Sequence, residues 1–171
     1  GTYNESVTVD VPNVFLEGPN AETAGYADRS NETVIEKGVN INASGVTFAG
    51  FEVTNNDVNG IILSDAPSDV TVTNNKVVNV SGDTAGPKGV GNGINLQFTD
   101  AFQTTSTGIE ITNNLIAGIT TPDNSNGDAD AIGRDVLDGV TERIDVDRGR
   151  PREVERRHLR ALPQRFGFEV Q

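Results

Sequence analysis

Four aspartates in loop-like segments are the residues of this chain best suited to chemistry on a sugar or a metal ion. Asp83, Asp100, Asp128 and Asp130 lie in stretches rich in Gly, Ser, Asn and Pro. Carboxylates that project together from one face would bind Ca²⁺ or act as acid and base on a glycosidic bond. We favour the competing interpretation of solvated turn acids, because residues 1–133 hold 17 Asp and Glu in all. No complete catalytic site is identifiable.

The amino-acid composition excludes several other kinds of catalytic, metal and binding site. The chain has no Cys, so thiol nucleophiles and zinc-cysteine sites are excluded, and its single His, His158, argues against a histidine-rich copper or zinc site. We expect no required cofactor, with Ca²⁺ the ion that the aspartates would take. The formal net charge of -12 repels nucleic acid. No apolar run approaches the ~20 residues of a membrane-spanning helix.

The same acidity, with only three Lys, is typical of proteins adapted to high salt, where carboxylates keep the chain hydrated. An ordinary acidic surface is the alternative. The core must come mainly from Val, Ile, Leu and a few Phe, which favours strands, so we predict an all-β fold.

Period-two alternation marks the elements that would position these residues. Val7, Val9 and Val11 alternate with polar residues, which predicts a half-buried strand. Further short strands are predicted over 33–36, 39–41 and 46–48. None of these segments is long enough for a helix.

Internal repetition is the strongest signal in the chain. Segments 46–55, 70–79 and 109–118 superimpose without gaps at offsets of 24 and 39 residues. Apolar residues occupy the first, third and eighth positions of the copies: Val46, Phe48 and Val53; Val70, Val72 and Val77; Ile109, Ile111 and Ile116. A second motif, Asn-Gly-Ile-x-Leu, recurs at 59–63 and 92–96, so each repeat supplies more than one strand.

Repeats of this spacing predict stacked coils. Two-residue hairpin signals are few, and equivalent strands lie too far apart in sequence for tight antiparallel turns. Stacking coils ~4.8 Å apart would pair each strand in parallel with its copy and bury a shared column of Val and Ile. We therefore predict a parallel β-helix over residues 1–133.

Asn pairs occupy one repeat position, where the chain must leave a strand and bend. These are Asn74 with Asn75, and Asn113 with Asn114. Asn tolerates the left-handed backbone conformation, and stacked Asn side chains would hydrogen-bond from coil to coil. The first copy has Gly50 and Phe51 instead, so such a ladder would begin only at later coils.

The opening segment GTYNESVTVDVPNVFLEGPN resembles the first coil of pectinesterase-like and related pectin-lyase-fold proteins. The segments VTVTNNKVVNVSG and IEITNNLIAGIT are similar to the parallel β-helix repeats (PbH1 repeats) of carbohydrate-binding and sugar-hydrolase modules, including NosD-like proteins. The resemblance covers residues 1–133 and implies a single-stranded, right-handed parallel β-helix. It further implies an extracellular or cell-surface scaffold that interacts with polysaccharide or a surface glycan.

The same resemblance leaves an enzyme open as the alternative, because one scaffold carries many activities. That enzyme would be a polysaccharide lyase, a hydrolase or a pectinesterase-like protein acting on acidic or neutral polysaccharide. The paired catalytic Asp residues and the Arg of pectinesterases have no recognisable counterpart here. In such families an amphipathic helix usually caps the first coil, and none precedes Gly1, so we expect the chain to be part of a longer polypeptide.

Composition changes near residue 134. Residues 134–171 hold nine Arg, eight acidic residues and no Asn, and if 131–134 continues the second repeat motif, Arg134 falls where an inward Leu belongs. Three interpretations stand for this Arg-rich tail. It is a capping helix with Val154, His158 and Leu162 on one stripe, a basic nucleic-acid arm diluted by its acids, or a stretch translated out of the ancestral frame. We favour the last.

Overall fold

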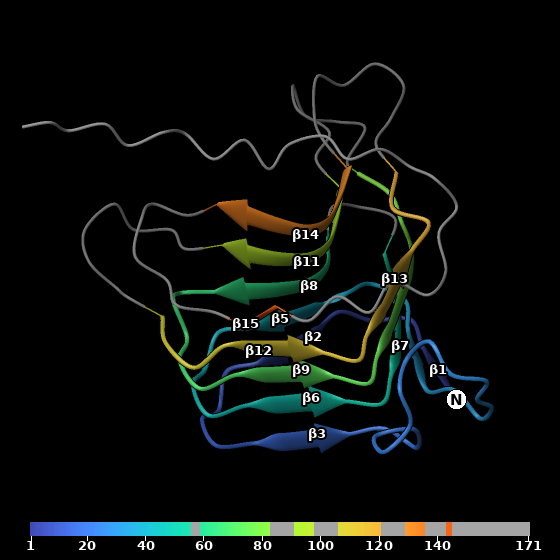
Figure 1. Ribbon diagram of the computed structural model, residues 1–171, viewed down its shortest axis with the longest axis horizontal. Helices are drawn as coiled ribbons and strands as arrows, with labels where there is room; N and C mark the ends of the chain where they lie inside the picture. The colour runs from blue at the N-terminus through green and yellow to red at the C-terminus, as the bar shows by residue number, and fades with distance from the viewer. Residues whose placement is uncertain (56–58, 83–90, 98–105, 121–128, 136–142, 145–171) are drawn as a thin grey trace, which may run out of the picture.

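In the computed structural model, every described element is a β-strand, and the strands form three five-stranded sheets in which all pairing is parallel (Figure 1). The structure describes residues 1–55, 59–82, 91–97, 106–120, 129–135 and 143–144. The all-β prediction is confirmed for these residues. The aspartates Asp83, Asp100 and Asp128 and most of the Arg-rich tail lie outside them.

The chain visits the three sheets in rotation. Sheet A contains β1 (Thr2–Tyr3), β4 (Val34–Ile35), β7 (Glu52–Asn55), β10 (Lys76–Val80) and β13 (Leu115–Ala117). Sheet B contains β2 (Val7–Val9), β5 (Val39–Ile41), β8 (Asn59–Ser64), β11 (Gly91–Gln97) and β14 (Ala129–Asp135). Sheet C contains β3 (Phe15–Glu17), β6 (Thr47–Ala49), β9 (Thr71–Thr73), β12 (Glu110–Thr112) and β15 (Arg143–Ile144).

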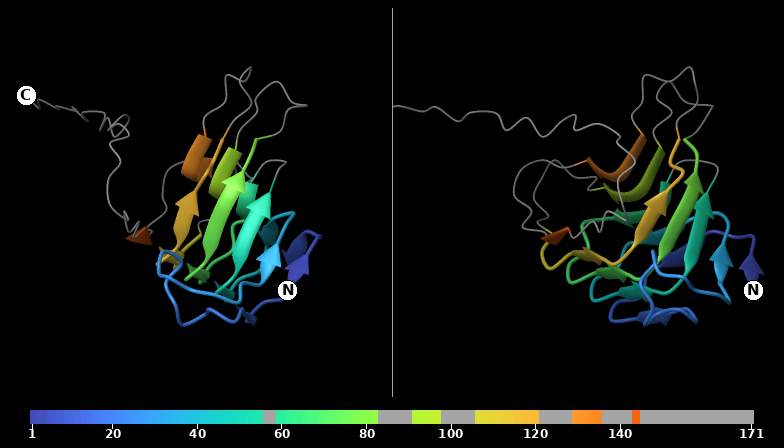
Figure 2. Two further views of the ribbon diagram at one scale, coloured as in Figure 1. Left: turned by 90° about the vertical axis from the view of Figure 1, so that its right-hand side faces the viewer. Right: turned by 45° about the vertical axis from the view of Figure 1, so that its right-hand side comes forward.

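Each turn of the chain therefore adds one strand to each sheet and lies on the turn before it, as the two views of Figure 2 show. This is the arrangement of a β-solenoid and is compatible with a parallel β-helix. Parallel strands need long crossover connections, and here the two other strands of the coil provide the crossover. Coil-over-coil stacking, as predicted from the repeats, is confirmed.

Columns of equivalent apolar side chains fill the interior. In sheet C, Phe48 pairs with Val72 and Val72 with Ile111, and all three are buried. In sheet A, Val53 pairs with Val77 and Val77 with Ile116. Sheet B supplies two further columns: Val7, Val39, Ile61, Ile94 and Ile132; and Val9, Ile41, Leu63 and Leu96. The inward pattern read from the repeats is the pattern of the core.

Of two details predicted from the sequence, one differs from the structure and the other agrees with it. β2 ends at Val9, and Val11 is 57% exposed, because Pro12 lacks an N–H and Asn13 turns the chain with a φ of 59°. The strand predicted to reach Val11 is therefore too long. Arg134, in contrast, pairs with Leu96, which is the register that the motif indicated.

The division of the chain at residue 133 stays a prediction. β14 runs through that position to Asp135, and β15 pairs in parallel with β12.

Candidate functional site

Polar side chains gather on the outer face of sheet B, where Oγ of Ser64 donates to Oδ1 of Asn40 in the coil below at 2.8 Å. Along β11, Ile94 and Leu96 are fully buried in the core, so Asn95 between them points to the opposite side of the sheet. Asn95 pairs with Ile62 of the coil below and Gly133 of the coil above, and Ile62 pairs with Asn40. This outward column is thus built from amide, aliphatic and bare glycine positions.

The Asn-Gly motif bends the strands at the entrance to this face. A Cβ on Gly60 would lie 2.5 Å from Cγ1 of Val77, and one on Gly93 would lie 2.4 Å from Cγ2 of Ile116, so both glycines face the packed interior. Because Gly93 and Ile94 both face inward, the strict alternation breaks there. The curvature of β11 and β14 is visible in the right-hand view of Figure 2.

Asn92, just before this bend, lies over the outer side of the next coil. A Cβ on Gly133 would point outward and would meet Cγ of the Asn92 side chain at 2.4 Å. The amide of Asn92 therefore occupies the space that a side chain at position 133 would need. Asn92 and Asn95 both lie beside Gly133, one through its side chain and one through strand pairing.

Both amides are buried and incompletely satisfied. Asn92 and Asn95 are each 4% exposed, and the Oδ1 atom of each has no hydrogen-bond partner. The equivalent Asn59 differs, because its Oδ1 accepts the backbone N–H of Asn92 at 3.2 Å. An unsatisfied buried acceptor costs about 1–3 kcal/mol. Oδ1 of Asn42 and Oγ of Ser106 are likewise buried without a partner among the described residues. Asn92 and Asn95 share one neighbour, Gly133, and this placement calls for a functional explanation.

Asp130 is the only predicted site aspartate within the described residues. It is exposed on β14 and pairs with Asn92, so it borders the same face. The other three candidates, Asp83, Asp100 and Asp128, cannot be placed relative to it because they lie outside the described residues. Within the described part of the chain, no group of three or more His, Asp or Glu side chains has the arrangement of a metal site.

The Asn pairs form the corner between sheets C and A. Asn74 and Asn113 adopt φ values of 56° and 54°, and Gly50 adopts 81° at the equivalent position. The second residue of each pair makes the coil-to-coil bonds. Oδ1 of Asn75 accepts the N–H of Phe51 at 3.0 Å, and Oδ1 of Asn114 accepts the N–H of Asn75 at 2.8 Å.

The Nδ2 groups of this ladder are also used. Asn75 donates to the carbonyl of Phe48 at 3.0 Å, and Asn114 donates to the carbonyl of Val72 at 2.8 Å. Phe51 replaces the amide in the earliest copy and stacks on Phe48 with ring centroids 4.7 Å apart. The amides of Asn75 and Asn114 are thus structural, unlike those on the outer face of sheet B.

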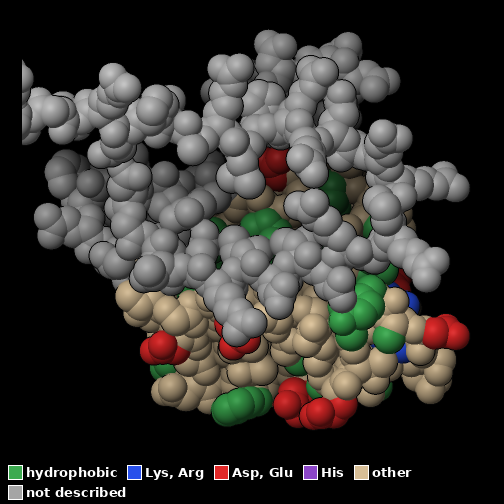
Figure 3. Space-filling view, viewed as in Figure 1, with side chains coloured by type: hydrophobic (Ala, Val, Ile, Leu, Met, Phe, Trp, Pro, Cys, Tyr) green, Lys and Arg blue, Asp and Glu red, His purple; other side chains and the backbone are tan. Residues whose placement is uncertain are grey.

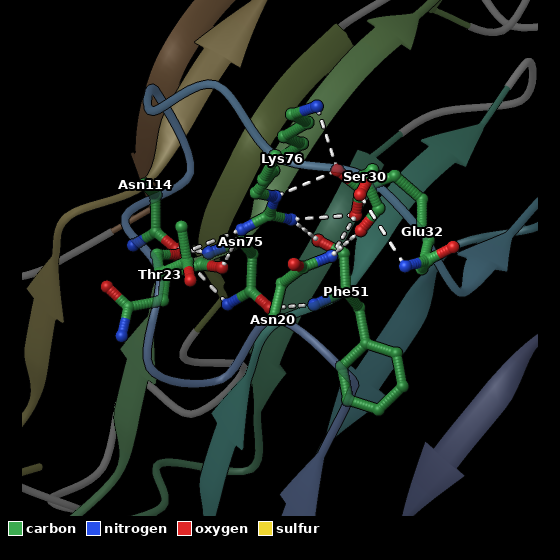
Figure 4. A network of polar contacts seen from close by, with 11 residues as sticks. Asn20, Thr23, Ser30, Glu32, Phe51, Asn75, Lys76 and Asn114 are labelled. Atoms are coloured by element: carbon green, nitrogen blue, oxygen red, sulfur yellow. Dashed lines mark hydrogen bonds and ion pairs between the residues drawn. The ribbon is translucent and has the colours of Figure 1, made fainter.

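A segment that lies outside the sequence repeats crosses this corner. Residues 18–33, which connect β3 to β4 and which we name the strap, lie along the corners of successive coils (Figure 4). The N–H of Gly25 donates to the carbonyl of Asn113 at 2.8 Å, and Nδ2 of Asn74 donates to the carbonyl of Ala21. A Cβ on Gly25 would lie 2.0 Å from the carbonyl oxygen of Asn75, so this contact requires glycine.

Arg29 anchors the strap. Its side chain is 1% exposed, and Nε and Nη2 donate to the two carboxylate oxygens of Glu32 at 2.8 and 3.1 Å. Three further bonds go to main-chain carbonyls: Nη1 to Thr23 at 3.0 Å, Nη1 to Asn74 at 2.6 Å, and Nη2 to Phe51 at 3.1 Å. Every one of the guanidinium's N–H donors therefore has a partner.

Glu32 joins this anchor to sheet A. Nζ of Lys76 on β10 lies 2.8 Å from Oε1 of Glu32, and Nδ2 of Asn20 donates to Oε2 at 3.2 Å. Burial opposes ionisation of the carboxyl, but the hydrogen bonds and charges of Arg29 and Lys76 outweigh it and hold the pKa of Glu32 below its ordinary value of 4.5. Sequence reasoning missed this cluster, because Asn20, Arg29 and Glu32 belong to no repeat.

Comparison of the chain with protein-family models, with curated proteins and with solved structures returned no match. Among the described residues, no helix has the length and apolar character needed to cross a membrane.

Proposed function

We propose that this chain is the body of an extracellular or cell-surface protein that interacts with carbohydrate through the outer face of sheet B. In this proposal the stacked coils form a right-handed parallel β-helix of the pectin-lyase-like kind. The chain acts as a scaffold for binding.

The observation that carries the proposal is where the connections vary in length. In the last three coils the corner between sheets C and A is always two residues, at 50–51, 74–75 and 113–114. The connections that enter sheet B over the same coils are 56–58, 81–90 and 118–128, and those that leave it include 65–70 and 98–109. Apart from the strap, which enlarges the corner between sheets C and A in the first coil, the insertions are concentrated at both ends of sheet B, and this is typical of a binding surface.

The chemistry of that face fits a sugar. The amide of Asn40 and the hydroxyl of Ser64, bonded to each other at 2.8 Å, lie on this face. The half-buried Ile62 adds an apolar contact between Asn40 and the buried amide of Asn95. Sugars offer hydroxyl groups and apolar C–H faces, and sites that bind small polar ligands combine the same two kinds of group. The acidic side chains scattered over the neighbouring face in Figure 3, with few basic ones among them, support a partner other than nucleic acid.

A polysaccharide lyase or hydrolase is the second candidate, and the position of Asp130 favours it. This exposed carboxylate borders the amide-lined face through its pairing with Asn92. One carboxylate within the described residues does not make an acid and base pair, which is why we place binding first.

Glycan-array binding, combined with a reducing-sugar and unsaturated-product assay with and without Ca²⁺, tests the proposal. We expect glycan binding without turnover. Turnover that is abolished by Asp130→Ala would favour the enzyme, whereas a chain that binds no glycan and produces no product would contradict both.

A further inference from the structure

We propose that Asn92 and Asn95 form an acceptor pair that binds the hydroxyl groups of a neutral glycan. The inference rests on the function proposed above, and it goes further by naming the binding residues and the class of sugar.

The two amides behave differently from every other stacked amide that the structure pairs. Oδ1 of Asn59, Asn75 and Asn114 each accepts a backbone N–H, at 3.2, 3.0 and 2.8 Å. Oδ1 of Asn92 and of Asn95 accepts nothing, although each residue is only 4% exposed. Oδ1 of Asn42 and Oγ of Ser106 are also buried without a partner among the described residues, so the missing bond alone does not set Asn92 and Asn95 apart. What these two share is Gly133 as a common neighbour, and this placement gives them another use.

Their placement makes them a pair. Asn95 is the strand partner of Gly133, and the Asn92 amide rests on the outer side of that same glycine. A larger residue at 133 would displace Asn92, because even a Cβ would come within 2.6 Å of three of its side-chain atoms. Gly133 is therefore a positioning residue that brings the two amides to one place on the face.

Amide oxygens that have no hydrogen-bond partner in the protein favour a ligand that carries hydrogen-bond donors. A carbonyl oxygen accepts from hydroxyl or N–H groups, and hydroxyls are the donors that sugars carry in abundance. A carboxylate-bearing sugar would instead meet Asp130 beside Asn92, in a chain of net charge -12.

The cations whose side chains the structure describes do not relieve that repulsion. Arg29 and Lys76 are both paired with Glu32 at the strap, and Lys37 lies in the turn that precedes β5. Neutral sugars are therefore favoured over uronates at this pair of amides.

The test compares apolar variants of the two amides with a structural amide. Asn92→Leu and Asn95→Leu keep the approximate side-chain shape and remove an unsatisfied acceptor, so we expect their urea midpoints to equal or exceed that of the wild type. Asn114→Leu breaks paired bonds and should lower the midpoint. Thr47→Val, on the outer face of sheet C, is the matched surface control.

Binding is measured by calorimetry with neutral gluco- and xylo-oligosaccharides and with oligogalacturonides. We expect neutral oligosaccharides to bind better, and each Leu variant to weaken their Kd about tenfold, the loss of one good hydrogen bond. Thr47→Val should leave the Kd unchanged. Gly133→Ala should weaken binding through displacement of Asn92.

Three outcomes would overturn the inference. Urea midpoints of the two variants that fall as far as that of Asn114→Leu would show the amides to be structural. Neutral-glycan affinity that is unchanged in both variants, or a preference for oligogalacturonides, would leave the proposed function standing and remove the acceptor pair. A wild-type chain that binds no glycan at all would contradict both the acceptor pair and the proposed function.

Discussion

Replacement of Arg29 by Met should destabilise the protein by about 3 kcal/mol. The Met side chain fills much of the same space but removes five hydrogen bonds, two to the Glu32 carboxylate and three to main-chain carbonyls. Removal of one partner from a buried ion pair costs about 3–5 kcal/mol. Lys76 still neutralises Glu32 at 2.8 Å, which places the expected cost at the lower end of that range.

Urea unfolding followed by circular dichroism measures this effect. With a slope of about 2 kcal/mol per molar urea, a loss of about 3 kcal/mol lowers the midpoint by roughly 1.5 M. Arg29→Lys is the matched control, because it keeps the charge but has no planar fork to reach three carbonyls at once, and it should lose about half as much. Limited proteolysis of the Met variant should cut first within the strap, residues 18–33.

A Met variant that loses less than about 1 kcal/mol, or a Lys variant as stable as the wild type, would refute the role given to the five hydrogen bonds of Arg29. The first result would mean that the attraction within the ion pair is no larger than the free energy needed to remove its two charges from water. The second would mean that charge alone, and not the five-bond geometry, holds the strap.

Three further predictions concern the strap and the corner. The folded-state pKa of Glu32 is lowered, so the contribution of this carboxylate to stability is present above pH 4.5 and is lost as the pH falls through the lowered pKa. The urea midpoint of Glu32→Gln should therefore change less with pH in that range than the urea midpoint of the wild type. Asn113→Val should cost about 1–2 kcal/mol in thermal unfolding, because φ is 54° there, whereas Asn113→Gly should be nearly neutral. Gly25→Ala should release the strap and raise hydrogen exchange of its own amide, because the new Cβ would lie 2.0 Å from the Asn75 carbonyl oxygen; the exposed Glu22→Ala, in the same segment, should not.

The repeated features of this fold could be predicted from the sequence because repetition exposes them. Inward residues such as Val72 and Ile111 recur at fixed positions, and a solenoid buries whatever recurs on its inner side. The corner residues follow from a local rule, since Asn and Gly are the residues that accept a positive φ at little cost. The position of Arg134 opposite Leu96 came from the same repeat register.

The features that occur once could not be predicted in this way. Arg29 and Glu32 lie in a 16-residue connection with no counterpart in later coils, and their partners, Asn74 and Lys76, are more than 40 residues away. The unsatisfied oxygens of Asn92 and Asn95 depend on a bend at Gly93 that breaks the alternation by which a strand's faces are assigned.

The sequence by itself therefore determined the stacked parallel coils, the columns of the core and the turning residues, because each depends on local conformational preference repeated along the chain. Only the tertiary structure decided which amides are bonded and which are left open, and which segment locks the corner. Those outcomes depend on contacts between coils whose spacing in the sequence is irregular.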